Sequence, residues 1–294
     1  MLARRIPIAF LCLAAAALAV SLASASPTKS RNGKIAFWSD LGPAAIFVIN
    51  PDGTGRRRLT DRSARSKGAA WSPDGTRIAL YGSADPGADA NFDIYVMNAD
   101  GSNRRRLTTA PEREVLPGWS PDGRRIAYGR AEDVWIMNAD GSGQHLAIRN
   151  AGEPAWSPNG RRIAFASLRK GRVDVFTAKV DGTAVRRLTR GPSDTEMPSW
   201  SPDGRRIAFI RFRGNDAADV YVMNADGSNA HRLTRSAARE DNASWSPDGR
   251  MIVFTSYRDG NGEIYVMNAD GSKQRRLTRT QLDEDADTWQ PLPR

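Results

Sequence analysis

The sequence predicts an all-β fold, a six-bladed β-propeller of four-stranded antiparallel blades that is closed by its C-terminal strand. Two recurring motifs support this prediction, Trp-Ser-Pro-Asp-Gly and, later in each unit, Asn-Ala-Asp-Gly-Ser, both with variants. The signature tryptophans are Trp71, Trp119, Trp156, Trp200, Trp245 and, in a degraded last copy, Trp289. Their spacing of about 37 to 48 residues is typical of a propeller blade.

The first strand of each predicted blade ends in the signature tryptophan, and three apolar runs follow it. The second strand is a short Ile-Ala run at 34–37, 77–80, 125–128, 162–165, 206–209 and 251–254. The third is a near-continuous apolar run at 46–49, 94–97, 134–137, 175–178, 220–223 and 264–267, as expected for a sheet covered on both faces. The fourth is expected at the Leu-Thr pairs and their variants, 59–60, 107–108, 146–147, 188–189, 233–234 and 277–278. Asp-Gly turns connect these strands.

The order of the strands along the chain predicts how the ring closes. The chain enters the repeat at a second strand, near Ile35, and ends with an additional first strand, near Trp289. We expect the segment 287–290 to supply the missing strand of the N-terminal blade, which would remove the open sheet edges. The predicted propeller therefore spans 34–294.

The N-terminal 25 residues have the features of a secretory signal peptide. Arg4 and Arg5 precede an apolar segment at 6–20, and Ala23-Ser24-Ala25 is a small-residue cleavage site. An uncleaved membrane anchor is the alternative, although the apolar segment is short for one. We expect a flexible leader at 26–33, a periplasmic, secreted or cell-envelope location, and no transmembrane segment after cleavage. The single cysteine, Cys12, lies in the signal, so disulfides and thiol chemistry are not expected in the mature chain.

The repeated motifs resemble the WD40-like (PD40) propeller repeat of the C-terminal domain of TolB, and the resemblance covers Lys34 to Trp289. It implies the propeller fold, whereas the same repeat occurs in many exported proteins and implies no particular partner. The α/β domain that precedes the TolB propeller has no room between Ala25 and Lys34, so we expect a propeller without that domain.

The loops between the second and third strands predict the position of a binding surface. The segments 81–93, 129–133, 166–174, 210–219 and 255–263 differ in length, whereas the turns after each tryptophan are constant. Variable loops on a rigid frame usually carry binding residues. The links between blades are expected on the same face and are acidic ahead of the tryptophans, except in the second blade, which has Lys67. The candidate binding residues at the channel mouth are Glu114, Glu153, Glu196, Asp241 and Asp285.

These carboxylates allow two interpretations. They can bind a channel cation, such as calcium, or a basic ligand, or they can be solvated loop charges. No other cofactor is expected. A second acidic column, Asp93, Asp133, Asp174, Asp219 and Glu263, recurs at one position ahead of the third strand. We expect it to be structural, accepting hydrogen bonds from backbone donors.

Arginine clusters before the Leu-Thr pairs predict a basic outer belt. They lie at 56–58, 104–106, 186–187 and 275–276, and the whole chain carries 43 Lys and Arg against 33 Asp and Glu, a formal charge of +10. The belt is either a solvated face or a surface for anionic envelope polymers or lipid headgroups. Nucleic acid is not an expected partner of an exported protein, although a basic belt suits it.

The sequence contains no recognisable catalytic motif. The only histidines, His145 and His231, precede leucines of the outer strand, far from the channel, and no Gly-x-Ser-x-Gly elbow or phosphate loop is present. We therefore expect a monomeric, exported, non-catalytic propeller that binds a protein or a cell-envelope component. The alternatives are a lactonase-like propeller hydrolase with a metal at the channel mouth, and a structural scaffold without a ligand.

Overall fold

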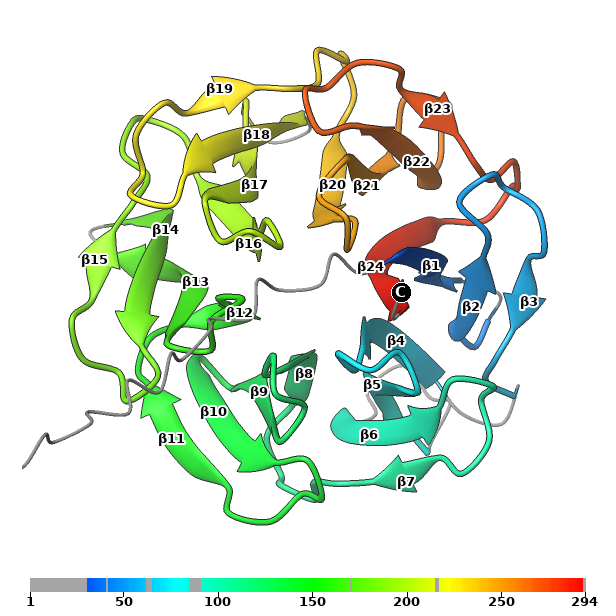
Figure 1. Cartoon of the computed structure of the whole chain (residues 1–294), viewed down its shortest axis with the longest axis vertical. Coiled ribbons are helices and arrows are strands. Elements are labelled where there is room, and N and C mark those ends of the chain that lie inside the picture. Colours follow the sequence, from blue (N-terminus) through cyan, green and yellow to red (C-terminus); the bar gives the residue numbers. More distant parts are fainter. Residues whose placement is uncertain are drawn as a thin grey trace, which may run out of the picture.

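The structure is a computed structural model that describes residues 31–40, 42–61, 65–84, 91–169, 171–214 and 217–292. Six four-stranded sheets surround a central axis (Figure 1). The described residues form strands and turns and contain no helix. The predicted fold class and number of blades are confirmed. The predicted signal peptide and most of the predicted leader lie outside the described residues.

The strands follow the predicted order within each blade. Blade 1 consists of β24 (Glu284–Leu292), β1 (Arg31–Ser39), β2 (Ala45–Ile49) and β3 (Arg57–Arg58). Blade 2 consists of β4 (Arg65–Trp71), β5 (Arg77–Ser83), β6 (Asp93–Asn98) and β7 (Arg105–Arg106). Blade 3 consists of β8 (Glu114–Trp119), β9 (Arg125–Arg130), β10 (Asp133–Asn138) and β11 (His145–Ile148). Blade 4 consists of β12 (Gly152–Trp156), β13 (Arg162–Arg169), β14 (Arg172–Lys179) and β15 (Arg186–Arg187). Blade 5 consists of β16 (Thr195–Trp200), β17 (Arg206–Phe212), β18 (Ala218–Asn224) and β19 (His231–Arg232). Blade 6 consists of β20 (Glu240–Trp245), β21 (Met251–Ser256), β22 (Glu263–Asn268) and β23 (Arg275–Arg276).

The C-terminal strand closes the ring as predicted. β24 pairs antiparallel with β1, with Trp289 opposite Ile35 and Glu284 opposite Ser39. The pairing continues to Arg31 opposite Leu292, so the first strand begins ahead of the predicted start at Lys34. The indole Nε1 of Trp289 donates to the carbonyl of Ser244 in blade 6 at 3.2 Å, which ties the closed blade to its neighbour.

The core lies between adjacent blades. One cluster joins Ile46 and Val48 of blade 1 to Trp71, Ile78 and Leu80 of blade 2, and all five side chains are buried. The apolar runs of the second and third strands are thus buried on both faces because each sheet packs against two others. Burial of apolar area at these contacts is the main stabilising term.

In five blades the outer strand lies just before the predicted Leu-Thr pair. In blade 1, Leu59 still donates its amide to the carbonyl of Ile46, at 2.8 Å, but Thr60 accepts the amide hydrogen of Ile46 with its Oγ1, at 3.0 Å. The threonine hydroxyl therefore replaces a backbone acceptor and ends the ladder. In blade 3 the outer strand includes the predicted segment 146–147, but Leu146 pairs with Trp135 where blade 2 places Arg106 opposite Tyr95, so Leu146 is equivalent to Arg106 and not to Leu107.

The second acidic column is structural, but its main partners are side chains. Asp93, Asp174, Asp219 and Glu263 are buried. They form ion pairs with the second outer-strand arginine of their own blades, Arg106 at 2.7 Å, Arg187 at 2.6 Å, Arg232 at 2.8 Å and Arg276 at 2.6 Å. The expectation of backbone donors is therefore wrong for most of the column. These arginines hold their blades together while their side chains stay 23–44% exposed on the basic outer belt.

The first arginine of each outer pair links neighbouring blades. Each donates to a backbone carbonyl in the Asp-Gly turn of the next blade, at distances from 2.9 to 3.2 Å. The pairs are Arg57 with Asp100, Arg105 with Asp140, Arg186 with Asp226, and Arg275 with Asp52. His145 and His231 stand at this same position, opposite Ile136 and Val222. Both lie on the outer rim, as predicted. The propeller has two faces, a turn face with the Pro-Asp-Gly and Asp-Gly turns, and a variable-loop face at the opposite ends of the strands, where the second strand of each blade ends and the third begins.

Candidate functional site

A β-bulge interrupts the innermost strand of blades 2–6 just ahead of the signature tryptophan. The residue three positions before each tryptophan has a positive φ, 59° at Gly68, 54° at Leu116, 56° at Glu153, 54° at Met197 and 47° at Asn242. This backbone conformation suits glycine, so blades 3–6 adopt it at a cost. Bulges re-aim side chains, and all five of these residues line the central cavity.

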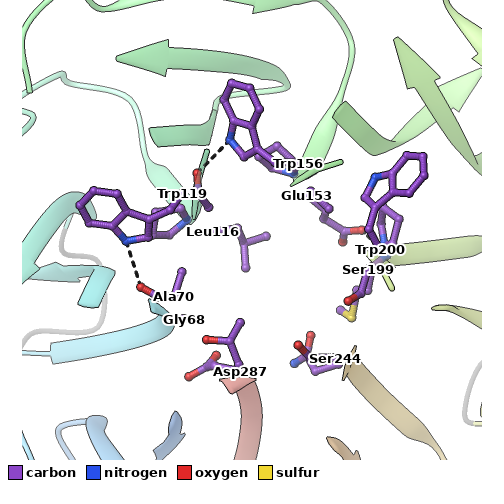
Figure 2. A pocket seen from close by; sticks show the side chains of 18 of the residues that line it. Gly68, Ala70, Leu116, Trp119, Glu153, Trp156, Ser199, Trp200, Ser244 and Asp287 are labelled. Atoms are coloured by element: carbon purple, nitrogen blue, oxygen red, sulfur yellow. Dashed lines mark hydrogen bonds between the residues drawn. The ribbon is translucent and has the colours of Figure 1, made fainter. Parts of the chain in front are cut away.

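The cavity lies on the propeller axis and has a volume of about 340 Å³ (Figure 2). Leu116 and Pro117 of blade 3 form an apolar wall, whereas Glu153 and Asp287 contribute carboxylates. The indoles of Trp119 and Trp156 point outward between the blades (Figure 2), and their Nε1 atoms donate to the carbonyls of Ala70 and Gly118 at 3.1 and 3.0 Å. Trp119 and Trp156 are therefore core residues, as predicted for the tryptophans, and the groups that face the cavity here are the bulge residues.

Five carboxylates from successive blades lie along one side of the channel, and we call them the acidic arc. They are Glu153 of β12, Glu196 of β16, Asp241 of β20, and Asp285 and Asp287 of β24. Burial, followed by the charge of Glu196, raises the pKa of Glu153 to about 8, although the Met197 amide donates to its Oε2 at 2.6 Å. Burial, followed by the charge of Asp285, raises the pKa of Asp241 to about 7 against the opposing effect of Arg239.

The remaining members of the acidic arc are also shifted towards their neutral forms. Burial raises the pKa of Asp285, although Thr255 Oγ1 and Asn242 Nδ2 donate to it at 2.5 and 2.6 Å. Burial raises the pKa of Asp287 well above its usual value, and the charge of Asp285 adds to this. If all five acids were ionised, their negative charge would exceed the positive charge around them, so their neutral forms are favoured. Lys67 of β4 lies at its end, and burial lowers the pKa of that ammonium.

Of the five predicted binding residues, the structure groups Glu153, Glu196, Asp241 and Asp285. Glu114 lies elsewhere, because it is fully buried between blades with its Oε1 3.8 Å from Nε of Arg130. The interpretation as solvated loop charge is wrong for Glu114 and Asp241, which are 0% and 3% exposed.

Sequence reasoning missed Asp287 and Leu116 as cavity residues. The bulge ahead of each tryptophan leaves no mark on the pattern of polar and apolar residues in the sequence, so neither its presence nor its position could be predicted. The only signal was the constant distance of three residues between the bulge and the tryptophan.

The part of the chain that the structure describes contains no cluster of three or more His, Cys, Asp or Glu side chains arranged to hold a metal ion. The same residues include no helix that is long and apolar enough to span a membrane.

Comparison with solved structures shows the same fold in proteins of several kinds. TolB from Acinetobacter baumannii is 20% identical with a TM-score of 0.77, and the match covers 88% of this chain and 66% of that one. The chain thus spans just under two thirds of that TolB. A chain of the nidogen/laminin complex is 12% identical with a TM-score of 0.68, covering 88% and 98%. An oligogalacturonate lyase in complex with manganese is 15% identical with a TM-score of 0.56, covering 85% and 74%. At these identities the likeness shows the fold alone.

A search of the curated proteins found no match. The family model of the TolB beta propeller domain (PD40) matches residues 87–217 and 133–291, two overlapping segments that together span well over half of the chain. These segments include the signature tryptophans of blades 3–6 and the closing strand up to Pro291. The chain therefore belongs to the TolB β-propeller family.

Proposed function

We propose that this protein is an exported, non-catalytic propeller that binds a protein or a cell-envelope component through its variable-loop face. In this proposal the acidic arc receives a cationic group of the partner. The arc is the observation that supports the proposal best, because two of its carboxylates, Glu153 and Asp287, line a cavity that Leu116 and Pro117 make apolar on another side.

The electrostatics of the arc favour a cationic partner. Burying an ionised carboxylate without a counter-charge costs free energy, which is why the pKa values of Glu153 and Asp241 are raised to about 8 and 7. A bound ammonium or guanidinium group would stabilise the ionised forms. Binding should therefore deprotonate the arc and strengthen as the pH rises towards 8.

The shape of the variable-loop face supports a macromolecular partner. The loops on this face differ from blade to blade, and the β13–β14 hairpin of blade 4 presents Leu168, which is 66% exposed. Variable loops around a cavity can recognise an extended surface while the cavity accepts one side chain. These features agree with a binding module better than with a small-molecule enzyme.

The test is capture of partners from an envelope extract by the immobilised chain at pH 8. The arc variant combines Glu153→Gln, Glu196→Gln and Asp241→Asn. The matched control combines Asp100→Asn, Asp140→Asn and Asp270→Asn, three acids of the turn face. We expect the wild type and the control to retain the same partner and the arc variant to lose it. Equal retention by both variants would contradict the proposal, as would hydrolysis of lactones or phosphoesters by the purified chain.

A further inference from the structure

The groove between blades 4 and 5 on the turn face departs from the repeat. It has a volume of about 830 Å³, within the range of small-ligand pockets. Arg162, Thr177 and Arg186 of blade 4 line one side, and Trp200 and Asp203 of blade 5 line the other. The groove shares Pro158 and Trp200 with the central cavity but contains none of the acidic arc.

In other blades, an arginine of the protein itself covers the corresponding indole. The arginine that opens the second strand lies over the signature tryptophan of the next blade. The distances from the guanidinium carbon to the ring centroid are 4.6 Å for Arg77 and Trp119, 4.9 Å for Arg125 and Trp156, and 4.5 Å for Arg206 and Trp245. These are cation–π contacts that also shield the ring from water.

Arg162 has the same place in blade 4 but a different contact. Its Nη2 donates to Thr177 Oγ1 and to the carbonyl of Ala184, both at 3.0 Å. The residues at the position of Thr177 in the other blades are aliphatic and offer no side-chain acceptor: Val48, Val96, Ile136, Val222 and Val266. Thr177 thus accounts for the direction of Arg162. Among the described residues, no cation lies over Trp200.

The consequence is an uncovered aromatic surface. Trp200 is partly exposed, whereas the other five signature tryptophans are only 4–8% exposed. This holds even for Trp71 and Trp289, which follow blades with Lys34 and Met251 at the arginine position. Trp200 is therefore the most exposed of the six signature tryptophans.

The charges of the groove favour an anion. Asn159 replaces the aspartate of the Trp-Ser-Pro-Asp-Gly motif, so the groove loses one negative charge relative to the other complete copies of the motif. Both hydrogen bonds of Arg162 use Nη2, which leaves Nε and Nη1 to a ligand. Arg186 uses only Nη2, to the carbonyl of Asp226 at 2.9 Å.

The groove also contains two carboxylates, Asp203 and Asp226, which accept hydrogen bonds from their own turns, and further cations lie nearby. Asp203 Oδ1 accepts from Ser201 Oγ and the Arg205 amide at 2.6 and 3.0 Å. The adjoining groove towards blade 3 contains Arg161 and Lys179, and Lys179 stands where the other blades have asparagine. The two grooves share Asn159 and Arg162, so together they form a continuous basic surface.

We propose that this groove binds an acidic saccharide, with a pyranose ring on the indole of Trp200 and its carboxylate on Arg162 and Arg186. A flat aromatic ring offers a matching surface for the C–H face of a sugar, and guanidinium groups bind carboxylates with two parallel hydrogen bonds. The site has no counterpart in the other blades because they keep a valine or isoleucine in place of Thr177.

Isothermal titration with a mannuronate hexamer prepared from alginate tests the site, with cellohexaose as the neutral probe. We expect the hexamer to bind at least tenfold more tightly than cellohexaose. Thr177→Val is the decisive variant, because it removes the acceptor that holds Arg162 and lets the guanidinium cover Trp200. It should weaken hexamer binding at least tenfold without a change in thermal unfolding. Thr177→Ser keeps the acceptor and should bind like the wild type.

A charge-matched pair separates the site from general attraction between a basic protein and a polyanion. Arg162→Gln and Arg206→Gln each remove one positive charge from equivalent positions. The site requires a loss of tenfold or more for Arg162→Gln and less than twofold for Arg206→Gln. The proposal fails if the wild type does not bind the hexamer, if both arginine variants weaken it equally, or if Thr177→Val binds undiminished. Capture of a partner by the variable-loop face should be the same for Thr177→Val and the wild type.

Discussion

The outer and inner strands of the same six blades differ in how strictly they repeat. At the outer rim, four blades use the same buried ion pair, for example Asp219 with Arg232. At the axis, the residue three positions before the tryptophan is Gly68, Leu116, Glu153, Met197, Asn242 or Ala286. Positions that hold a blade together keep one chemistry around the ring, whereas positions that face the cavity vary. Divergence within the repeat therefore identifies the surface that is free to specialise.

The two regions also differ in electrostatic balance. The buried acids of the outer rim each face an arginine of their own blade. In the inner arc, Asp241 pairs with Arg239 at 2.5 Å, but Glu153 faces Glu196 and Asp241, and burial together with this repulsion raises its pKa to about 8. The outer rim therefore stabilises the fold, and the inner arc destabilises it in the absence of a ligand.

The largest expected effect concerns the closing strand. Trp289 is 4% exposed and packs between blades 1 and 6, so Trp289→Ala should lower the free energy of unfolding by about 3–5 kcal/mol. Trp200→Ala, at the partly exposed position, should cost roughly half as much. Urea unfolding followed by far-ultraviolet circular dichroism measures both. Equal losses would show that the ring does not depend on its closure more than on an internal blade.

A smaller effect is expected from the outer ion pairs. Asp219 is fully buried and accepts from Arg232 and Thr234, so Asp219→Ala should cost about 2–4 kcal/mol because it strands a partly buried guanidinium.

Asp133→Ala provides the matched control for this prediction. In blade 3, Leu146 replaces the partner arginine, and Asp133 accepts one bond, from the Asn150 amide at 2.8 Å. Its removal should cost about 1 kcal/mol or less. If Asp219→Ala and Asp133→Ala lower the free energy of unfolding by similar amounts, the ion pair is not the source of the stabilisation.

The inner arc should behave in the opposite way, because removal of a charge there should stabilise the fold. Between the ordinary value of 4.5 and about 8, folded Glu153 keeps a proton that the unfolded chain has released, so stability falls as the pH rises through this range. Glu153→Gln should remove that loss and gain on the order of 2 kcal/mol at pH 8, with little gain at pH 5. Thermal unfolding at both pH values measures the difference. A gain that does not depend on pH would exclude the proposed origin.

The fold could be predicted from the sequence because each blade repeats the same signals at the same spacing. The six tryptophans gave the blade number, and the extra copy at Trp289 gave the closure. The outer strand was displaced because the hydroxyl of Thr60 competes with a backbone acceptor, which a pattern of apolar residues does not reveal. Local hydrogen-bond competition of this kind is visible only in the structure.

The site was predicted only in part. Four of the five candidate carboxylates lie together, and each of these four stands three or four residues ahead of its tryptophan. Glu114 differs because it lies one residue further from the tryptophan than Glu196, Asp241 and Asp285, and successive residues of a strand face opposite sides. The bulge then turns the third residue before the tryptophan into the cavity. The sequence shows how far each carboxylate is from its tryptophan, but not which side of the strand the side chain lies on.

The smallest expected effect concerns the links between outer strands. Arg275 of blade 6 donates to the carbonyls of Asp52 and Pro51 in blade 1, at 3.1 and 2.7 Å, from an exposed position. Arg275→Ala should therefore cost at most about 1 kcal/mol. His231→Arg supplies the equivalent donor between blades 5 and 6 and should stabilise by about 0.5 kcal/mol. Chemical unfolding of the two variants measures both signs. If His231→Arg is neutral while Arg275→Ala is costly, the outer link serves the closure of the ring rather than each pair of blades.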